Sequence, residues 1–592
     1  MLAILIALPL ALAAFAMLAL RGSAKNTAKY IALAASIVTL ALILLSSFNS
    51  SALQSITWFS FSNFQFALST STLPLNMILL YLVGIMTPLI IIYSIGYMDV
   101  PSEQSRFYFE LCLFASAMLI FAMAGDFLTL FIGWEILGIT SYLLIGFWYY
   151  KEGAADAARK AITTILIGDI LMLIAIIIVW STFGTFSFQA ILLKSAGNSG
   201  AMEIALVLIM LAAFTKSAQF PFNEWLADAM KGPTPVSAFL HSSTMVKAGV
   251  FLIAVLLPLF IQYNLLYLLL AFGIITTIIG ITNALSENNI KRILAYSTME
   301  DLGLMLIALG TGSLVAAMIL FVVQTFYKAL LFMNSGAMIK ANNNEEDITK
   351  MYNNASNLKL SIPTVMGVLS LAGLFPLSGF FGKTAIVASA NSFLIYYILI
   401  AFSFLSSLYI FRWLFVPMKK KNEKRAETAK TGYKLIPRSM QISIYALAVL
   451  VCAASIIYFY LPSYLLGKST VFAITELQII ISTAIVAIAL IISYVLFYRK
   501  KYVSIDSRNP VHNIIYNNVL TNRAYSSFAH VFDLISKGID EYDYTVYELI
   551  KQAAHSVVAL GNILKKLDDG ETSTYLAAFV IGFVIIILFL ML

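Results

Sequence analysis

Apolar residues in this chain form long stretches separated by short polar segments. Many stretches hold about 20 residues, the length of α-helix that crosses the hydrocarbon core of a bilayer. This pattern predicts an all-α polytopic membrane protein with about 16 transmembrane helices. They are expected at residues 2–20, 30–47, 74–96, 107–124, 127–149, 161–181, 203–222, 235–259, 264–285, 293–310, 312–339, 361–381, 382–417 (broken or tilted), 440–461, 473–498 and 574–592.

Residues 511–573 follow a different pattern, in which apolar side chains recur every three or four positions between Tyr525 and Leu567. This spacing predicts an amphipathic helix that lies along a surface. A continuous helix over 511–568 would be roughly 85 Å long at 1.5 Å per residue. We therefore expect a lateral helix that extends across neighbouring subunits, anchored by the span at 574–592. The alternatives are a helix resting on lipid headgroups and, less favoured, a coiled-coil partner.

Composition supports a membrane location and limits the chemistry of the chain. Of the 592 residues, 61% are hydrophobic and 11% are charged, whereas soluble proteins carry about 25% charged residues. Two cysteines and four histidines cannot supply a conventional iron–sulfur cluster, and no glycine-rich phosphate loop is present. We expect no cofactor or metal in this chain, so any redox or nucleotide chemistry belongs to another subunit.

The distribution of Lys and Arg predicts the topology. Loops after odd-numbered spans hold 30 of the 37 basic residues, and loops after even-numbered spans hold only Lys194 and Lys468. The positive-inside rule places the odd loops in the cytoplasm and both termini outside. Residues 2–20 have no basic leader before them, which favours a retained span over a cleaved signal peptide. The net charge of +8 thus reflects topology and does not indicate nucleic-acid binding.

The basic cytoplasmic loop at 418–439 contributes much of the positive charge. Its side chains suit the anionic headgroups of a lipid bilayer. The alternative is a loop that only sets topology.

Two spans are predicted to be interrupted. Pro221 closely follows Lys216, and Pro376 precedes Lys383 in the segment LAGLFPLSGFFGKT. Proline removes a helix hydrogen bond, and free backbone at membrane depth is tolerated where it is buried or lines a wet cavity. Two interrupted segments, each with a lysine, in corresponding positions of two halves suggest an inverted-repeat transporter.

Ionisable residues inside the apolar stretches are the candidate functional site. Each such charge costs roughly 2.5–3.5 kcal/mol, and such groups usually mark ion or proton routes. The main series is Glu135, Lys216, Lys247, Lys328 and Lys383. The alternatives are a packing role for the glutamate and, for a lysine near a helix end, a side chain that reaches the headgroups.

His241 is six residues before Lys247, in the same predicted helix, and is a candidate bridge between two lysines. The alternative is a structural histidine. Asp169 is another acid in an apolar span, either functional or a structural partner. Glu300 and Asp301 are adjacent, so their side chains point about 100° apart on a helix. We expect one of these two to join the series and the other to lie at an interface or boundary.

Five motifs carry a resemblance to a known family, and they extend from about residue 60 to residue 410. They are GWEILGITSYLLIGFWY, TKSAQFPFNEWLADAMKGPTPVSAFLHSSTMVKAGVFLIA, NIKRILAYSTM, FYKALLFMNSGAMI and LAGLFPLSGFFGK. They resemble the antiporter-like subunits of proton-translocating NADH–quinone oxidoreductase, respiratory complex I. The long terminal helix with its last span is similar to the distal, L-type subunit.

The resemblance implies two inverted five-helix repeats. The resulting organisation is N-terminal helices at 1–106, repeats at 107–259 and 264–417, the basic loop at 418–439, two helices at 440–498, the lateral helix at 511–573 and the anchor at 574–592. By resemblance, Glu135 and Lys216 form the pair of the first half-channel. His241 and Lys328 continue a central hydrophilic axis, and Lys383 belongs to the second half-channel.

The chain also departs from the L-type pattern. Lys247 stands where many L-type chains have threonine, and Leu166 replaces an arginine. Gln324 and Leu320 stand where histidines are frequent, and Thr384 replaces an acid after the terminal lysine. Lys247, Glu300 and Asp301 are the candidates to compensate for these replacements.

The resemblance further implies a redox-driven proton translocase subunit in the cytoplasmic membrane of a prokaryote. Its partners would be other antiporter-like subunits and the quinone module. The alternative is an Mrp-type or stand-alone cation/proton antiporter, and a third interpretation is a scaffold with relic charges. The lateral helix favours the first, because such a helix needs neighbours to brace.

Overall fold

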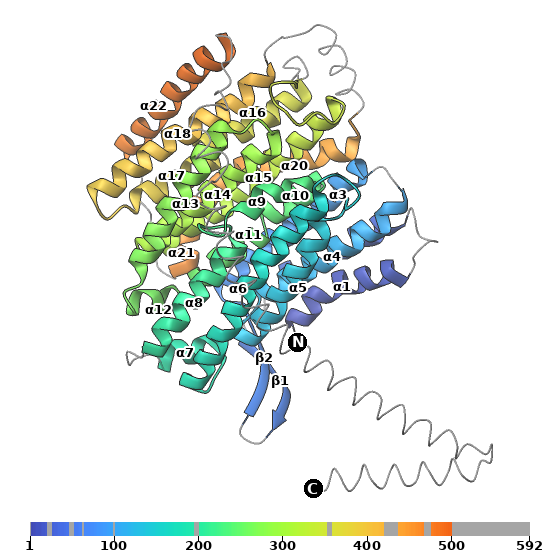
Figure 1. The fold of residues 1–592 in the computed structure, drawn as a ribbon, viewed down its shortest axis with the longest axis vertical. Helices are drawn as coiled ribbons and strands as arrows, with labels where there is room; N and C mark the ends of the chain where they lie inside the picture. Colours follow the sequence, from blue (N-terminus) through green and yellow to red (C-terminus); the bar gives the residue numbers. More distant parts are fainter. Residues whose placement is uncertain are drawn as a thin grey trace, which may run out of the picture. The chain divides into compact units, whose positions relative to one another are not determined.

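The structure is a computed structural model that describes most of the chain as helices (Figure 1). The described residues are 2–19, 27–46, 53–61, 64–98, 101–194, 200–351, 358–418, 436–466 and 475–499. The predicted lateral helix and final span lie outside these residues, as does most of the basic loop at 418–439.

The N-terminal region contains a β-hairpin that the all-α prediction missed. Its elements are α1 (Leu2–Ala19), α2 (Ala28–Ser46), β1 (Leu53–Phe61), β2 (Phe64–Ser71) and α3 (Pro74–Tyr97). The strands are antiparallel, with Leu53 opposite Ser71. The Ser71 N–H donates to the Met123 carbonyl (2.7 Å) and the Gly125 N–H donates to the Ser69 carbonyl (2.9 Å). The hairpin therefore docks on the turn that joins the next two helices, which helps to stabilise a pair of strands that alone would be marginal.

The regions predicted as repeats follow. The first contains α4 (Pro101–Ala122), α5 (Phe127–Ile145), α6 (Ala154–Phe183), α7 (Phe188–Lys194), α8 (Gly200–Lys216), α9 (Glu224–Asp228), η1 (Ala229–Lys231), α10 (Thr234–Ser242), α11 (Met245–Val255) and α12 (Leu257–Gln262). The second contains α13 (Leu266–Ser286), α14 (Ile290–Gly310), α15 (Leu314–Ala341), α16 (Leu358–Ala372), α17 (Ser378–Ala388) and α18 (Phe393–Met418). The last described elements are α20 (Arg438–Ala453), η2 (Ala454–Ile456), α21 (Ile457–Leu466), α22 (Glu476–Ser493) and η3 (Tyr494–Arg499).

Within the described residues, 12 helices are long and apolar enough to cross a membrane. Two shorter apolar helices, Leu5–Met17 and Leu360–Ala372, accompany them. The multi-pass architecture is thus confirmed, whereas the number of 16 spans and the repeat symmetry remain predictions. The predicted boundary at residue 382 is wrong, because it falls inside α17 and the next helix begins at Phe393.

Both predicted interruptions are present. Helix α8 ends at Lys216, and α9 begins only at Glu224. Helix α16 ends at Ala372, and α17 begins at Ser378. The peptide bonds before Pro221 and Pro376 in these segments are cis.

A third break separates His241 from Lys247, which the sequence analysis placed in one helix. The chain leaves helical geometry at Thr244 (φ −131°, ψ −103°), between α10 and α11. The Ser243 and Thr244 hydroxyls donate to the Phe239 carbonyl. Serine and threonine hydroxyls of this kind compete with the backbone for helix carbonyls, so the three consecutive hydroxyl residues Ser242, Ser243 and Thr244 favour an interruption.

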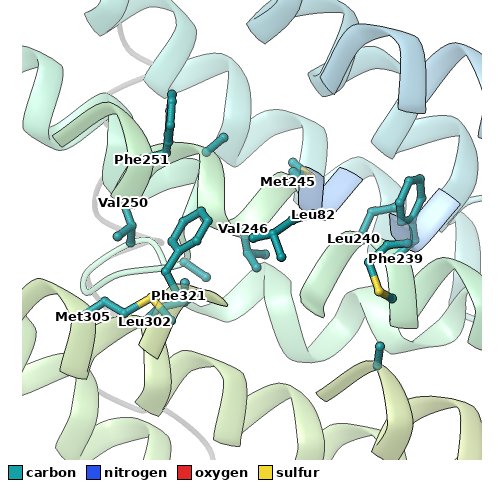
Figure 2. Close-up of a cluster of buried hydrophobic side chains, with 14 of the residues drawn as sticks. Leu82, Phe239, Leu240, Met245, Val246, Val250, Phe251, Leu302, Met305 and Phe321 are labelled. Atoms are coloured by element: carbon teal, nitrogen blue, oxygen red, sulfur yellow. The ribbon is translucent and has the colours of Figure 1, made fainter. Parts of the chain in front are cut away.

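Central helices are buried on nearly all sides, and peripheral helices are not. In the apolar stretch of α14 that could cross the membrane, 100% of the residues are buried. The share is 94% in α15 and in the segment Thr234–Val255, whereas in the helix that contains α22 it is 17%. In Figure 1 the first three lie in the middle of the bundle. Figure 2 shows how the two halves meet there, with Val250 of α11, Leu302 and Met305 of α14 and Phe321 of α15 in one apolar cluster.

Glycines allow close approach of other helices to the end of α8. A Cβ atom at Gly168 of α6 would lie 1.9 Å from Thr215 Oγ1, and one at Gly249 of α11 would lie 2.1 Å from the Ala213 carbonyl oxygen. Real Cβ atoms do not approach other atoms so closely. The end of α8 is therefore held between two helices that cannot carry side chains at the contact.

Gly249→Ala tests this packing. We expect the added methyl group to force α11 and α8 apart and to destabilise the protein by about 1–3 kcal/mol, the usual cost of overpacking. The measurement is the thermal unfolding midpoint of the purified protein in detergent. Gly200→Ala is the control, because a Cβ there meets nothing within 4 Å. Equal midpoints for the two variants would contradict the prediction.

Candidate functional site

The charges singled out in the sequence lie inside the bundle. Lys216, Lys247, Lys328, Lys383, His241, Asp169, Glu300 and Asp301 are buried. Glu135 is half-buried. A buried charge is tolerated when it is paired or hydrogen-bonded, so the contacts of each side chain show how the site is built.

Lys216 contacts Asp169 and not the glutamate that the resemblance implies as its partner. Its Nζ is 3.7 Å from Asp169 Oδ1 and donates a hydrogen bond to the Trp134 carbonyl. The Trp134 indole N–H donates to the same carboxylate oxygen (2.6 Å). Glu135 forms no ion pair with any described residue, and its Oε1 is buried without a hydrogen-bond partner among them. The first cluster therefore has one lysine, one acid in contact and a second acid with a free oxygen.

The position of Lys216 at the end of α8 also favours its charge. The last carbonyls of a helix lack intrahelical partners and carry the negative end of the helix dipole. The Lys216 ammonium lies 4.3 Å from the centroid of the Trp134 ring, which adds a cation–π contact. The break after α8 thus supports a buried positive charge.

Lys247 is bonded to neutral groups. Its Nζ donates to the Phe321 carbonyl and to the Thr325 hydroxyl, both on α15. Among the described residues it has no carboxylate within 4.0 Å. Lys247 therefore differs from the other three lysines, each of which has an acid within that distance.

His241 lies between the halves, with its ring 6.3 Å from that of Trp225 and 6.2 Å from that of Phe332. Neither of its ring nitrogens has a hydrogen-bond partner among the described residues. The same is true of at least one buried side-chain atom in each of Gln219, Asn223, Ser237, Gln324 and Asn334. Buried polar groups nearly always have partners, and water often supplies them.

Asp301 and Lys328 form the most deeply buried ion pair of the second cluster. Asp301 Oδ2 is 3.1 Å from Lys328 Nζ and accepts a hydrogen bond from the Tyr327 hydroxyl (3.0 Å). Lys328 also donates to the Ser297 hydroxyl. Both side chains of the pair are fully buried.

Glu300 pairs with the other lysine of this cluster. Its Oε1 is 3.9 Å from Lys383 Nζ, and it accepts a hydrogen bond from the Tyr409 hydroxyl. Lys383 donates to the Ser406 hydroxyl at 2.6 Å. The acid that Thr384 does not provide thus comes from a different helix, α14.

The expectation that only one of Glu300 and Asp301 would join the lysine series is wrong. Their directions do diverge, but α14 is surrounded by protein, so each direction meets a different lysine-bearing helix. Asp301 reaches α15, and Glu300 reaches α17. Because the two acids point in different directions, α14 can pair with a lysine on each of two other helices.

A second group of charges, which sequence reasoning left unassigned, lies where α14 begins. Asp228 accepts from Lys160 (2.9 Å) and lies 3.7 Å from Arg292, which also pairs with Glu287 (2.9 Å). Arg412 donates to the Glu287 carbonyl (2.7 Å). These contacts tie α6 and α9 of the first half to α13, α14 and α18 of the second. The sequence signal was the cluster of charges around NIKRIL.

We call the membrane side at which α14 begins the inner face and the side at which it ends the outer face, following the predicted topology. At the inner face, Lys291 pairs with Glu346 (2.7 Å). Partial burial alone would raise the pKa of Glu346. The Lys291 ammonium and the hydrogen bond from the Asn289 amide together lower the pKa by more than burial raises it, so the net direction is down. Among the described residues, no three His, Cys, Asp or Glu side chains are grouped in a way that could hold a metal ion.

Comparisons with known proteins place this arrangement in context. The family described as NADH:quinone oxidoreductase/Mrp antiporter, TM, matches residues 124–408. The family described as NADH-Ubiquinone oxidoreductase (complex I), chain 5 N-terminus, matches residues 58–108. The two matches are separated by residues 109–123 and cover most of both regions predicted as repeats.

Individual relatives agree. NADH-quinone oxidoreductase subunit L of Campylobacter jejuni is 33% identical over 484 residues, which are 80% of this chain and 79% of the relative. NAD(P)H-quinone oxidoreductase subunit 5 from the chloroplast of Mesostigma viride is 37% identical over 382 residues, or 61% of this chain and 58% of that protein. NAD(P)H-quinone oxidoreductase chain 5 of a Synechocystis species is 36% identical over 409 residues, or 65% of this chain and 60% of that protein. The chain thus spans less than two thirds of the last two relatives.

Two solved structures share the fold. A chain of the Mrp complex from Dietzia sp. DQ12-45-1b matches with a TM-score of 0.71 and 23% identity, covering 94% of this chain and 63% of that one. A chain of the membrane-bound sulfane sulfur reductase, an archaeal respiratory membrane complex, matches with a TM-score of 0.70 and 20% identity, covering 82% and 99%. At these identities the likeness is one of fold.

The Asp301–Lys328 pair predicts a non-additive effect on stability. Lys328→Met should destabilise the protein by roughly 3–5 kcal/mol, because it leaves a buried carboxylate without its counter-ion. Adding Asp301→Asn should restore much of the loss. The measurement is the thermal unfolding midpoint in detergent. Lys350→Met, which removes an exposed pair with Asp347, should cost less than about 1 kcal/mol; additive losses for the buried pair would contradict the prediction.

The Lys291–Glu346 pair predicts a pH dependence. A carboxyl group with a lowered pKa stabilises the fold above its unfolded-state pKa of about 4.3, and this contribution is lost as pH falls through the folded-state value. Glu346→Gln should therefore lower the unfolding midpoint near pH 7 by an amount equivalent to at most about 1 kcal/mol, since the carboxylate is partly exposed. The difference should disappear in acid. Glu152→Gln, at an exposed site, should behave like the unchanged protein at every pH.

Proposed function

The chain belongs to the antiporter-like membrane subunits of the NADH:quinone oxidoreductase and Mrp antiporter family, the L-type group that its motifs resemble, and on this premise we propose that it carries protons across a membrane. The observation that supports this most is the buried series of acids and lysines that runs through both halves. Ionisable groups at membrane depth are expensive and typically mark ion or proton routes.

In the first half, the proposal assigns the switch to Lys216 and two acids. Lys216 contacts Asp169, and the free oxygen of Glu135 offers a second acceptor nearby. Moving the ammonium from one acid to the other changes the electrostatic support for its charge, since an ion pair favours the charged form. A charge change in a neighbouring subunit would bias this choice. The implied Glu135–Lys216 pair then becomes one of two alternative arrangements.

Between the halves, the proposal assigns proton transfer to water. His241, Gln324 and Asn334 have buried polar atoms with no partner among the described residues, and such atoms can bind bridging water molecules. Lys247 lies on this route and is held by neutral groups. It is thus suited to pass a proton on and not to retain one.

In the second half, Lys328, Asp301, Glu300 and Lys383 continue the relay. Lys328 pairs with Asp301 and Lys383 pairs with Glu300. Because these two acids are consecutive on α14, the partner of one lysine is next to the partner of the other. Protons enter from the inner face and leave outward near Lys383. Lys247, Glu300 and Asp301 take over the role of the histidines and the acid that this chain lacks.

The proposal includes an assembly and a location. Similar chains are named as subunits of NADH-quinone oxidoreductases, so we place this chain among other antiporter-like and quinone-module subunits. It carries no redox cofactor itself, and redox chemistry in other subunits drives it. We expect it in the cytoplasmic membrane of a prokaryote, with both termini outside, and the lateral helix at 511–573 across its neighbours.

The alternative is exchange of a cation for a proton by an Mrp-type assembly. The matched family covers both kinds of protein, and an Mrp chain shares the fold. The native complex discriminates the two. Co-purification of redox subunits favours redox-driven pumping, and sodium-dependent proton movement without an electron donor favours exchange.

Neutral variants of the first cluster test the proposal. In membrane vesicles that contain the native assembly, Lys216→Met and Asp169→Asn should lower the number of protons moved per electron, because each removes one partner of the switch. Glu135→Gln should do the same if both acids serve. The measurement pairs proton uptake with electron-transfer rate.

Lys194→Met is the matched control, because this lysine is exposed and donates only to the Phe183 carbonyl among the described residues. It should leave the ratio of protons to electrons unchanged. An unchanged ratio in Lys216→Met, with the assembly intact, would exclude proton transfer through this cluster.

A further inference from the structure

A small cavity adjoins Lys383 on the side away from the rest of the lysine series. It lies between α16, α17, α18 and α22 and has a volume of about 20 Å³ for the centres of water molecules. One water molecule needs roughly 10–15 Å³ by this measure. Polar side chains from three helices line it, namely Lys383, Thr384, Tyr396, Ser403, Gln478 and Ser482.

The cavity lies between Lys383 and the outer face. Helix α17 continues from Lys383 to Ala388, and α18 begins at Phe393, so these helix ends share one face. The Thr311 hydroxyl, just after α14, donates to the Ser389 hydroxyl (3.3 Å), which identifies that face as the outer one. Ser403 is in the half of α18 nearer this face.

Helix α22 supplies the remaining wall with residues in the first half of the helix. Gln478 and Ser482 are in its first two turns, and both line the cavity. The helix is otherwise a peripheral one, with 17% of its hydrophobic window buried. The Ser482 hydroxyl makes no hydrogen bond to any described residue, although a serine within a helix commonly donates to a carbonyl of the preceding turn.

Water is a better occupant of this cavity than an acyl chain. A water molecule in a protein interior needs two to four polar partners, and the ammonium of Lys383 with the hydroxyls of Ser403 and Ser482 can provide them. An acyl chain would leave the Ser482 hydroxyl without a partner, at a cost of about 1–3 kcal/mol, whereas Lys383 and Ser403 already donate to the Ser406 hydroxyl and the Leu399 carbonyl. The size of the cavity also suits water and excludes a methylene chain.

We propose that α22 forms the outer wall of a water-filled outlet that connects Lys383 with the outer face, and that Ser482 and Ser403 position the water in it. This inference rests on the proposed proton route and adds a helix outside the two predicted repeats to it. The water carries the proton from Lys383 Nζ outward by exchange of hydrogen bonds. Replacing Ser482 by a large apolar side chain blocks this exchange without touching the lysine.

Cysteine accessibility tests the water path without turnover. In the native assembly, with Cys112→Ala and Cys452→Ala as background, Ser482→Cys and Ser403→Cys are exposed to silver ions, a thiol-reactive cation small enough for the cavity. Both thiols should lose their reaction with maleimide, which is added after the protein is unfolded in detergent, when silver was added at the outer face, and keep it when silver was added at the inner face. Ile488→Cys on the same helix, at a position 52% exposed on the bundle surface, should keep it in both cases.

A blocking variant tests the link to pumping. Ser482→Phe should lower the number of protons moved per electron, whereas Ile488→Phe should not. Lys383→Met is the reference for the proposed route. If Lys383→Met lowers the ratio and Ser482→Phe does not, or if the Ser482 thiol reacts only from the inner face, the outlet is refuted and the route stands. If neither Lys383→Met nor Ser482→Phe changes the ratio, the proposed route itself fails.

Discussion

Taking an ammonium group out of water costs several kcal/mol unless nearby dipoles or anions replace its hydration, and the architecture of this bundle follows from that cost. Each of the four lysines of the membrane series is met by a carbonyl or hydroxyl oxygen, and three of them also by a carboxylate. These partners come from helices other than the one that bears the lysine. The charges therefore favour central positions for the helices that carry them, and α14, α15 and the segment Thr234–Val255 are the most buried of the described candidate spans.

The two halves meet this requirement in different ways. In the first half, Lys216 uses the end of a helix, a tryptophan carbonyl and one acid from α6. In the second half, α14 supplies two consecutive acids to lysines on two other helices. In the first arrangement Glu135 forms no ion pair with any described residue, whereas in the second each acid pairs with a lysine and a tyrosine hydroxyl. The regions predicted as two repeats thus differ in how they hold their buried lysines.

Sequence reasoning succeeded where a residue type has a local consequence. Proline and lysine within apolar stretches gave the interruptions near Pro221 and Pro376 and the members of the buried series. It failed where the outcome depends on tertiary neighbours, as with Glu300 and Asp301, whose partners are on helices that α14 meets only in the folded bundle. The hairpin at 53–71 did show alternating polar and apolar residues, but the preference for membrane helices obscured this signal.

The close packing around α8 sets limits on how Lys216 can change partners. Gly168 and Gly249 bring two helices into contact with Thr215 and Ala213 on either side of it, so a movement of α8 would have to displace α6 and α11 as well. The simplest way to exchange the partners, as proposed above, is then rotation of the lysine side chain about its own bonds. On the proposed switch, the backbone around this lysine should therefore superimpose in every functional state.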